Sequence, residues 1–85
     1  MTYETFRAWA TRLGIPDRQS DLARLLGVSQ PSVSSLARAA ADDPSAQVPA
    51  WHVRTLELVE MMQEAGCDPV PALLGEVPMP ADEAG

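Results

Sequence analysis

Apolar residues recur at the three- and four-residue spacing of helices in four stretches of this chain. In the first stretch Phe6, Trp9 and Leu13 share one face, which predicts a helix over residues 3–13 with these side chains in the core. The other patterns predict helices over residues 18–26, 30–39 and 50–65, and one short further turn over 69–74. The chain is therefore expected to form an all-α fold of four helices plus a short fifth.

Residues typical of helix ends and turns separate these stretches. Thr2, Asp17 and Ser29 each precede a predicted helix, where a side-chain oxygen can cap a free backbone N–H. Residues 40–48 contain the turn-forming run Asp-Asp-Pro-Ser, which predicts a loop between the third and fourth helices.

Residues 19–38 form a pattern of two short helices joined by a tight turn. Ala23 is a small side chain where the two helices would touch, and Gly27 stands where the chain needs left-handed backbone. Pro31 suits the first turn of the second helix, because its missing N–H would be unpaired there anyway. The outward positions of that second helix carry short, hydrogen-bonding side chains and one cation: Gln30, Ser32, Ser34, Ser35 and Arg38.

This stretch resembles the helix-turn-helix of Cro/repressor-type, lambda-repressor-like DNA-binding proteins. Six residues carry the resemblance at the expected spacing: Gln19, Ala23, Gly27, Val28, Val33 and Leu36. The chain is also similar to small phage-type regulators, including anti-CRISPR-associated repressors. The resemblance implies a lambda-repressor-like domain whose second motif helix enters the major groove of double-stranded DNA.

The resemblance also implies roles for individual residues. Gln30 and Ser34 would face base edges, where a glutamine can bond adenine with two hydrogen bonds. Arg38 would reach a guanine or a flanking phosphate, and Gln19 would meet a phosphate at the start of the first motif helix. The remaining candidates for base or phosphate contact are Arg18, Arg24, Ser29, Ser32 and Ser35. A solvated, serine-rich helix face is the alternative interpretation of this pattern.

The predicted helix over 50–65 has a wide apolar surface for so small a chain. One stripe consists of Trp51, Thr55, Leu58 and Met62, and an adjoining stripe consists of Val53, Leu56, Val59 and Met61. One stripe is expected to close the core and the other to bind a second copy, so that the protein is a homodimer. His52 is expected to be an exposed residue of the first helical turn.

The net charge of −6 is unusual for a nucleic-acid binder, but the charge is unevenly distributed. Residues 1–39 carry five Arg against three acids, a net +2, and residues 40–85 carry one Arg against nine acids, a net −8. The helix-turn-helix half can therefore act locally despite the total. The acidic half supports an alternative function, in which the chain is a protein–protein interaction module that docks on polymerase or another basic partner.

Several classes of function are excluded or disfavoured by composition. The chain has one His, one Cys and no Lys, without a catalytic constellation, metal-ligand spacing or phosphate-binding glycine loop, so no enzyme, metal or cofactor is expected. A lone cysteine and the lack of a long apolar run fit a reducing cytoplasm, at the nucleoid of a bacterial or phage-infected cell. We expect one DNA-binding domain over 1–74, with its motif at 19–38 and dimerisation helix at 50–65, and a flexible acidic tail over 75–85.

Overall fold

Five helices account for most of the residues that the computed structural model describes, which are residues 1–75. They are α1 (Tyr3–Arg12), α2 (Gln19–Leu26), α3 (Gln30–Asp42), α4 (Ala50–Glu64) and α5 (Val70–Leu73). Within residues 1–75 the only β pairing is an isolated bridge between Thr2 and Gln47. The predicted all-α class and the short fifth helix are thus confirmed. The predicted tail, apart from Gly75, lies outside the described residues.

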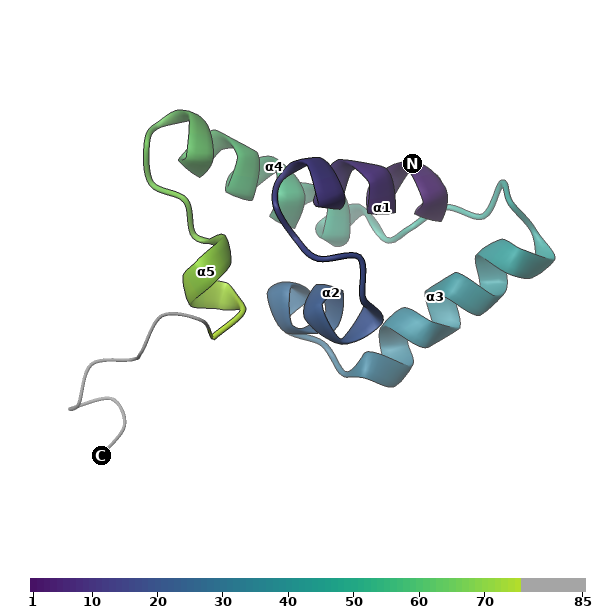
Figure 1. Cartoon of the computed structure of the whole chain (residues 1–85). Helices are drawn as coiled ribbons and strands as arrows, with labels where there is room; N and C mark the ends of the chain where they lie inside the picture. The colour runs from purple at the N-terminus through teal and green to yellow at the C-terminus, as the bar shows by residue number, and fades with distance from the viewer. Residues whose placement is uncertain (76–85) are drawn as a thin grey trace.

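The helices form two groups. Figure 1 shows α1 and α4 on one side of the molecule and α2 and α3 on the other, with α5 beside α2. Between α1 and α4, Gln63 Nε2 donates to the carbonyl oxygen of Leu13 at 2.6 Å, and Trp9 Nε1 donates to Glu60 Oε2 at 3.4 Å. The loop after α3 returns to the N-terminus, where the backbone N–H of Val48 donates to the carbonyl oxygen of Met1 at 2.9 Å.

One hydrophobic core joins all five helices. Its fully buried centre contains Phe6 of α1, Leu22 of α2, Val33 of α3 and Leu56 of α4, and Val70 of α5 is also buried. Trp9 is buried as predicted and belongs to the core. The core therefore fixes α2 and α3 from behind and leaves their outer faces to solvent.

Two of the three predicted N-terminal caps are wrong. Thr2 caps α1 as expected, with its Oγ1 accepting from the backbone N–H of Thr5 at 3.3 Å. Asp17 does not cap α2, because its carboxylate forms an ion pair with Arg7. Ser29 occupies the cap position of α3 without a side-chain bond to the backbone, and its hydroxyl pairs with that of Ser32 instead.

The predicted loop over 40–48 begins later than expected. Residues 40–42 continue α3, which ends at Asp42. The extension follows from the run Ala39–Ala41, since alanine has the highest intrinsic helix propensity and outweighs the turn signal that follows.

His52 is buried, so the prediction of an exposed first-turn histidine is wrong. It shares a helix face with Leu56 and Val59 and is 4% exposed. Its ring centroid lies 3.9 Å from that of Trp51 and 6.1 Å from that of Phe6. Its Nδ1 has no hydrogen-bond partner among residues 1–75. Burial lowers the pKa of His52, because the desolvated site disfavours the charged ring.

The protein is expected to lose stability as the pH falls from 7.5 to 5.5. As the pH falls, the unfolded chain binds a proton at His52 near the ordinary pKa of about 6.5, whereas the folded chain binds it only at a lower pH. Protonation therefore favours the unfolded chain, and the free energy of unfolding decreases below that pH. We expect the free energy of unfolding of His52→Gln to decline less steeply across this range. Urea unfolding at several pH values measures the difference, and equal slopes for the two proteins would contradict the assignment.

Candidate nucleic-acid interface

The turn between α2 and α3 fixes how α3 is presented. Gly27 ends α2 with φ of +73°, a left-handed conformation that other residues rarely adopt. The backbone N–H of Val28 then donates to the carbonyl oxygen of Ala23 at 3.0 Å and closes the turn. Ala23 itself is buried, as expected of a small side chain where two helices touch. The predicted left-handed turn at Gly27 is confirmed.

A side-chain hydrogen bond adds a second link between α2 and α3. The hydroxyl of Ser34 donates to Gln19 Oε1 at 2.7 Å, and both side chains are half-buried. Two residues predicted to contact DNA are therefore brought together, and each also holds the helix pair in place. The amide NH₂ of Gln19 has no partner among residues 1–75, so it can still donate to a phosphate.

The outer face of α3 is exposed and slightly concave. Gln30, Ser35 and Arg38 are exposed there. Together with Pro31 and Ser34 they line a shallow, open hollow of about 470 Å³. Four of these five residues are candidates predicted from the sequence, whereas Pro31 is predicted only to suit the first turn of the helix. The four-residue spacing from Pro31 to Ser35 was the available signal that it shares this face.

Two further candidates lie at the start of α3 outside this hollow. The hydroxyls of Ser29 and Ser32 lie 3.0 Å apart, and both residues are exposed. Either hydroxyl can exchange this bond for a phosphate or base, so both remain available for contact.

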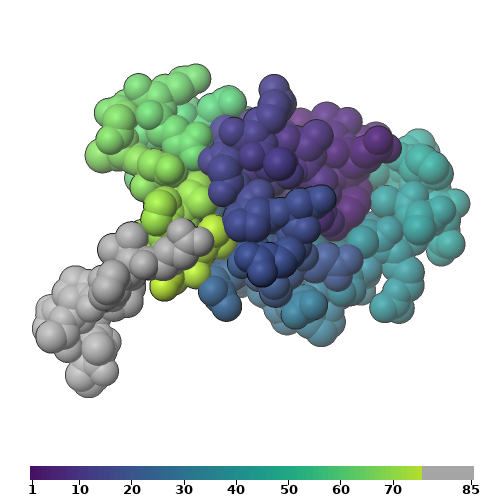
Figure 2. All heavy atoms as spheres, viewed as in Figure 1, coloured from purple at the N-terminus to yellow at the C-terminus, as the bar shows by residue number. Residues whose placement is uncertain are grey.

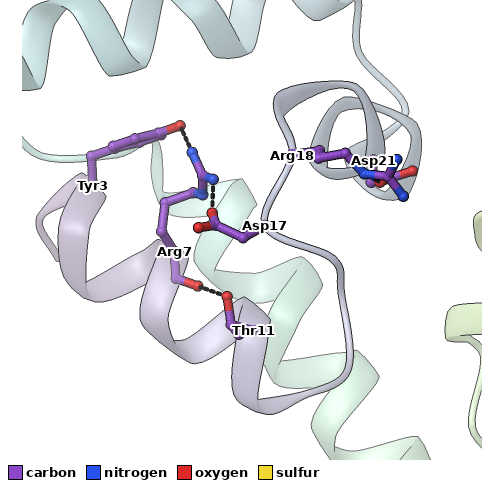
Figure 3. Close-up of polar contacts among 6 residues, drawn as sticks. All are labelled: Tyr3, Arg7, Thr11, Asp17, Arg18 and Asp21. Carbon is purple, nitrogen blue, oxygen red and sulfur yellow. Dashed lines mark hydrogen bonds and ion pairs between the residues drawn. The ribbon is translucent and has the colours of Figure 1, made fainter.

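The arginines of the first half differ in their surroundings. Figure 3 shows the guanidinium of Arg7 between the Tyr3 hydroxyl, to which it donates at 2.7 Å, and the carboxylate of Asp17. Arg18 Nε lies 2.8 Å from Asp21 Oδ2, an ion pair without hydrogen-bond alignment.

Arg24 is also engaged within the fold. Its Nη1 donates to the carbonyl oxygen of Leu74 at 2.8 Å and thereby fastens the end of α5 to α2. Arg38 and Arg12, in contrast, are exposed and have no ion-pair or hydrogen-bond partner among residues 1–75. Arg38 is thus the free cation of the α3 face.

Two acids follow Arg38 along α3. Asp42 and Asp43 are exposed, and the Asp43 carboxylate accepts from the backbone N–H and the hydroxyl of Ser45 at 3.1 and 2.7 Å. The bond from the Ser45 hydroxyl, and then that from the Ser45 backbone N–H, lower the pKa of Asp43 below its ordinary value. Negative charge at this end of α3 disfavours an approaching phosphate, whereas the first two turns of the helix carry no acid.

The predicted dimerisation residues are mostly exposed on α4. Trp51, Leu58 and Met62 are exposed, while Thr55 is half-buried and donates its hydroxyl to the carbonyl oxygen of Trp51. In the adjoining stripe Leu56 and Val59 are buried in the core, whereas Met61 is 62% exposed. The free apolar surface of α4 is therefore wider than the predicted stripe.

Within residues 1–75, no three His, Cys, Asp or Glu side chains lie close enough together to hold a metal ion, and Cys67 is an exposed free thiol. Of the helices in residues 1–75, none has the length and apolar character needed to cross a lipid bilayer.

Comparison with known proteins gives no assignment: the chain matches no protein-family model, and no curated protein or solved structure is significantly similar to it.

Proposed function

We propose that this chain is a sequence-specific, double-stranded DNA-binding transcriptional regulator with a lambda-repressor-like helix-turn-helix formed by α2 and α3. The observation that supports this most directly is the outer face of α3, where Gln30, Ser35 and Arg38 surround an open hollow. Val33 anchors the opposite face of the same helix in the core. In Figure 2 the α2–α3 segment lies at an edge of the molecule away from α4, where a groove of DNA could reach it.

The side chains on this face have the chemistry of base recognition. Gln30 can bond the N6 and N7 atoms of an adenine, and Arg38 can bond the O6 and N7 atoms of a guanine. Ser34 and Ser35 can each donate or accept a hydrogen bond. The major groove is about 12 Å wide and admits one helix, so α3 can bring these residues to base edges together.

Stability alone does not explain this composition. Serines within a helix compete for backbone hydrogen bonds and are weaker helix formers than alanine. Ser35 is exposed and forms no side-chain bond among residues 1–75, so it contributes nothing visible to the fold. A face selected for recognition accounts for the serines and for the free guanidinium of Arg38.

In this proposal α2 lies across the DNA backbone. Gln19 and the free N–H groups at the start of α2 would meet a phosphate. The protein would act as a homodimer in the cytoplasm, at the nucleoid, on a pseudo-palindromic operator whose half-sites lie about 34 Å apart, one turn of DNA.

Selection of bound sequences from a random DNA pool tests the proposal. We expect enrichment of an inverted repeat, and binding to it should weaken as salt rises. The slope of log K against log salt should be about −0.9 for each phosphate contacted. Failure to enrich any sequence at low salt would overturn the proposal and would favour the acidic protein-interaction module.

A further inference from the structure

A band of large apolar side chains runs along the outer face of α4. Trp51 is 49% exposed, Leu58 60%, Met61 62% and Met62 45%. The opposite face of the same helix packs into the core through Leu56 and its buried neighbours. Contiguous apolar surface of this kind is characteristic of an interaction site.

Charged residues border this band on one side. Arg54, Glu57 and Glu64 are all exposed and, at 100° per residue, fall on the same flank of α4 as Met61. Arg54 is the single cation of α4 and lies in its N-terminal half, whereas Glu57 lies at the middle of the helix and Glu64 is its last residue. The flank is therefore polarised along the helix.

We propose that the occupant of this band is α4 of a second copy, packed antiparallel across a two-fold axis on the exposed side of the helix, at the level of residue 59 along it. The inference rests on the homodimer part of the proposed function and adds the contact surface, the helix direction and the register. An isologous contact of this kind uses the same patch on both copies, as a closed dimer requires.

Charge complementarity selects the antiparallel direction. A two-fold axis near residue 59 places Arg54 of each copy level with the partner's Glu64, so that two opposite-charge pairs border the apolar band. A parallel pair would instead place Arg54 beside Arg54 of the second copy, and each glutamate beside the same glutamate of the second copy. Such like-charge neighbours repel each other. The antiparallel arrangement also opposes the two helix dipoles.

The size of the band indicates a weak dimer. Four side chains that are each about half exposed supply less than the roughly 800 Å² per partner of a standard stable interface. We therefore expect dissociation in the micromolar range without DNA. An operator with two half-sites would strengthen the pair by binding both copies at once.

Sedimentation equilibrium of the full chain without DNA tests the contact. We expect a concentration-dependent dimer for the natural protein and a monomer for Leu58→Glu, which buries a charge in the band. Leu58 is exposed in the single copy, so this variant should keep its helical circular dichroism. A natural protein that is monomeric at all accessible concentrations would overturn the proposal.

Charge reversal tests the direction and register. Arg54→Glu and Glu64→Arg should each weaken the dimer about three- to tenfold, and the double variant should restore it, because every pair is again of opposite charge. Glu4→Arg on α1 changes the net charge in the same sense and by the same amount as Glu64→Arg, and it should leave the dimer unchanged. In a parallel pair each single reversal would only replace one like-charge pair by another, so single reversals that leave the dimer unchanged would overturn the antiparallel arrangement.

These measurements are independent of DNA recognition. A monomer that still selects a DNA sequence would refute the α4 contact alone. A dimer that each single reversal weakens and the double variant restores, but that selects no DNA sequence, would refute the DNA-binding proposal alone.

Discussion

Replacing Phe6 with alanine is expected to lower the free energy of unfolding by about 3–5 kcal/mol, a large part of the total for a domain of this size. Phe6 is 0% exposed and lies on α1 at the centre of the core. Its ring faces that of His52 on α4, so truncation leaves a cavity between the two helices. Urea unfolding followed by circular dichroism measures the loss.

The effect should be specific to the buried position. Leu73→Ala removes an apolar side chain that is 41% exposed, and we expect a cost of less than about 1 kcal/mol. If the two substitutions cost the same, Phe6 would not be at the centre of a packed core. Because α1 supports α3 through this core, Phe6→Ala should also weaken DNA binding in proportion to the unfolded fraction.

The helices were predictable because their signals are local. The spacing of Phe6, Trp9 and Leu13 is that of one buried face, and these residues are buried in the structure. Gly27 marks the turn through a backbone preference that depends on glycine itself. Such features need no knowledge of what lies across the fold.

Tertiary contacts account for the predictions that were wrong. Aspartate is a residue type that caps helices well, but the carboxylate of Asp17 forms an ion pair with the guanidinium of Arg7 on α1 instead of capping α2. His52 is predicted to be exposed in the first turn of its helix, but its helix face places it beside Leu56 and against Phe6. In both cases the deciding partner lies on another element, beyond the reach of a sequence window.

The same limit applies to the candidate site. The resemblance implies that Arg38 meets a guanine or a phosphate, and it leaves Arg18 and Arg24 as further candidates for phosphate contact. The fold uses Arg7, Arg18 and Arg24 in contacts of their own and leaves Arg38 free on the face of α3. The structure also shows that Pro31 lines the same hollow and that Ser34 bonds to Gln19.

Replacing Arg38 with alanine is therefore expected to weaken binding to the selected DNA by about 1–3 kcal/mol, or roughly 5- to 150-fold. Arg38 is exposed on α3 beside Ser34 and Ser35, and its planar guanidinium can bond a guanine edge or a phosphate with two hydrogen bonds. Loss of a base contact would relax specificity at one position of the half-site. Loss of a phosphate contact would instead reduce the salt slope by about 1 per site. Titration of a fluorescent operator at several salt concentrations separates the two.

Arg12→Ala provides the matched control, because it removes the same charge from an exposed arginine on α1, away from the α3 face. If binding depends on net charge alone, both variants should weaken it equally, and the recognition role of α3 would be refuted. If α3 lies in the groove, Arg12→Ala should change affinity by less than about threefold, in line with a screened charge at a distance. Arg38→Lys adds a further distinction, since lysine keeps the charge but lacks the planar fork. If Arg38 contacts a phosphate, Arg38→Lys should bind better than Arg38→Ala. If Arg38 bonds a guanine, Arg38→Lys should bind no better than Arg38→Ala. The three variants together therefore assign the contact.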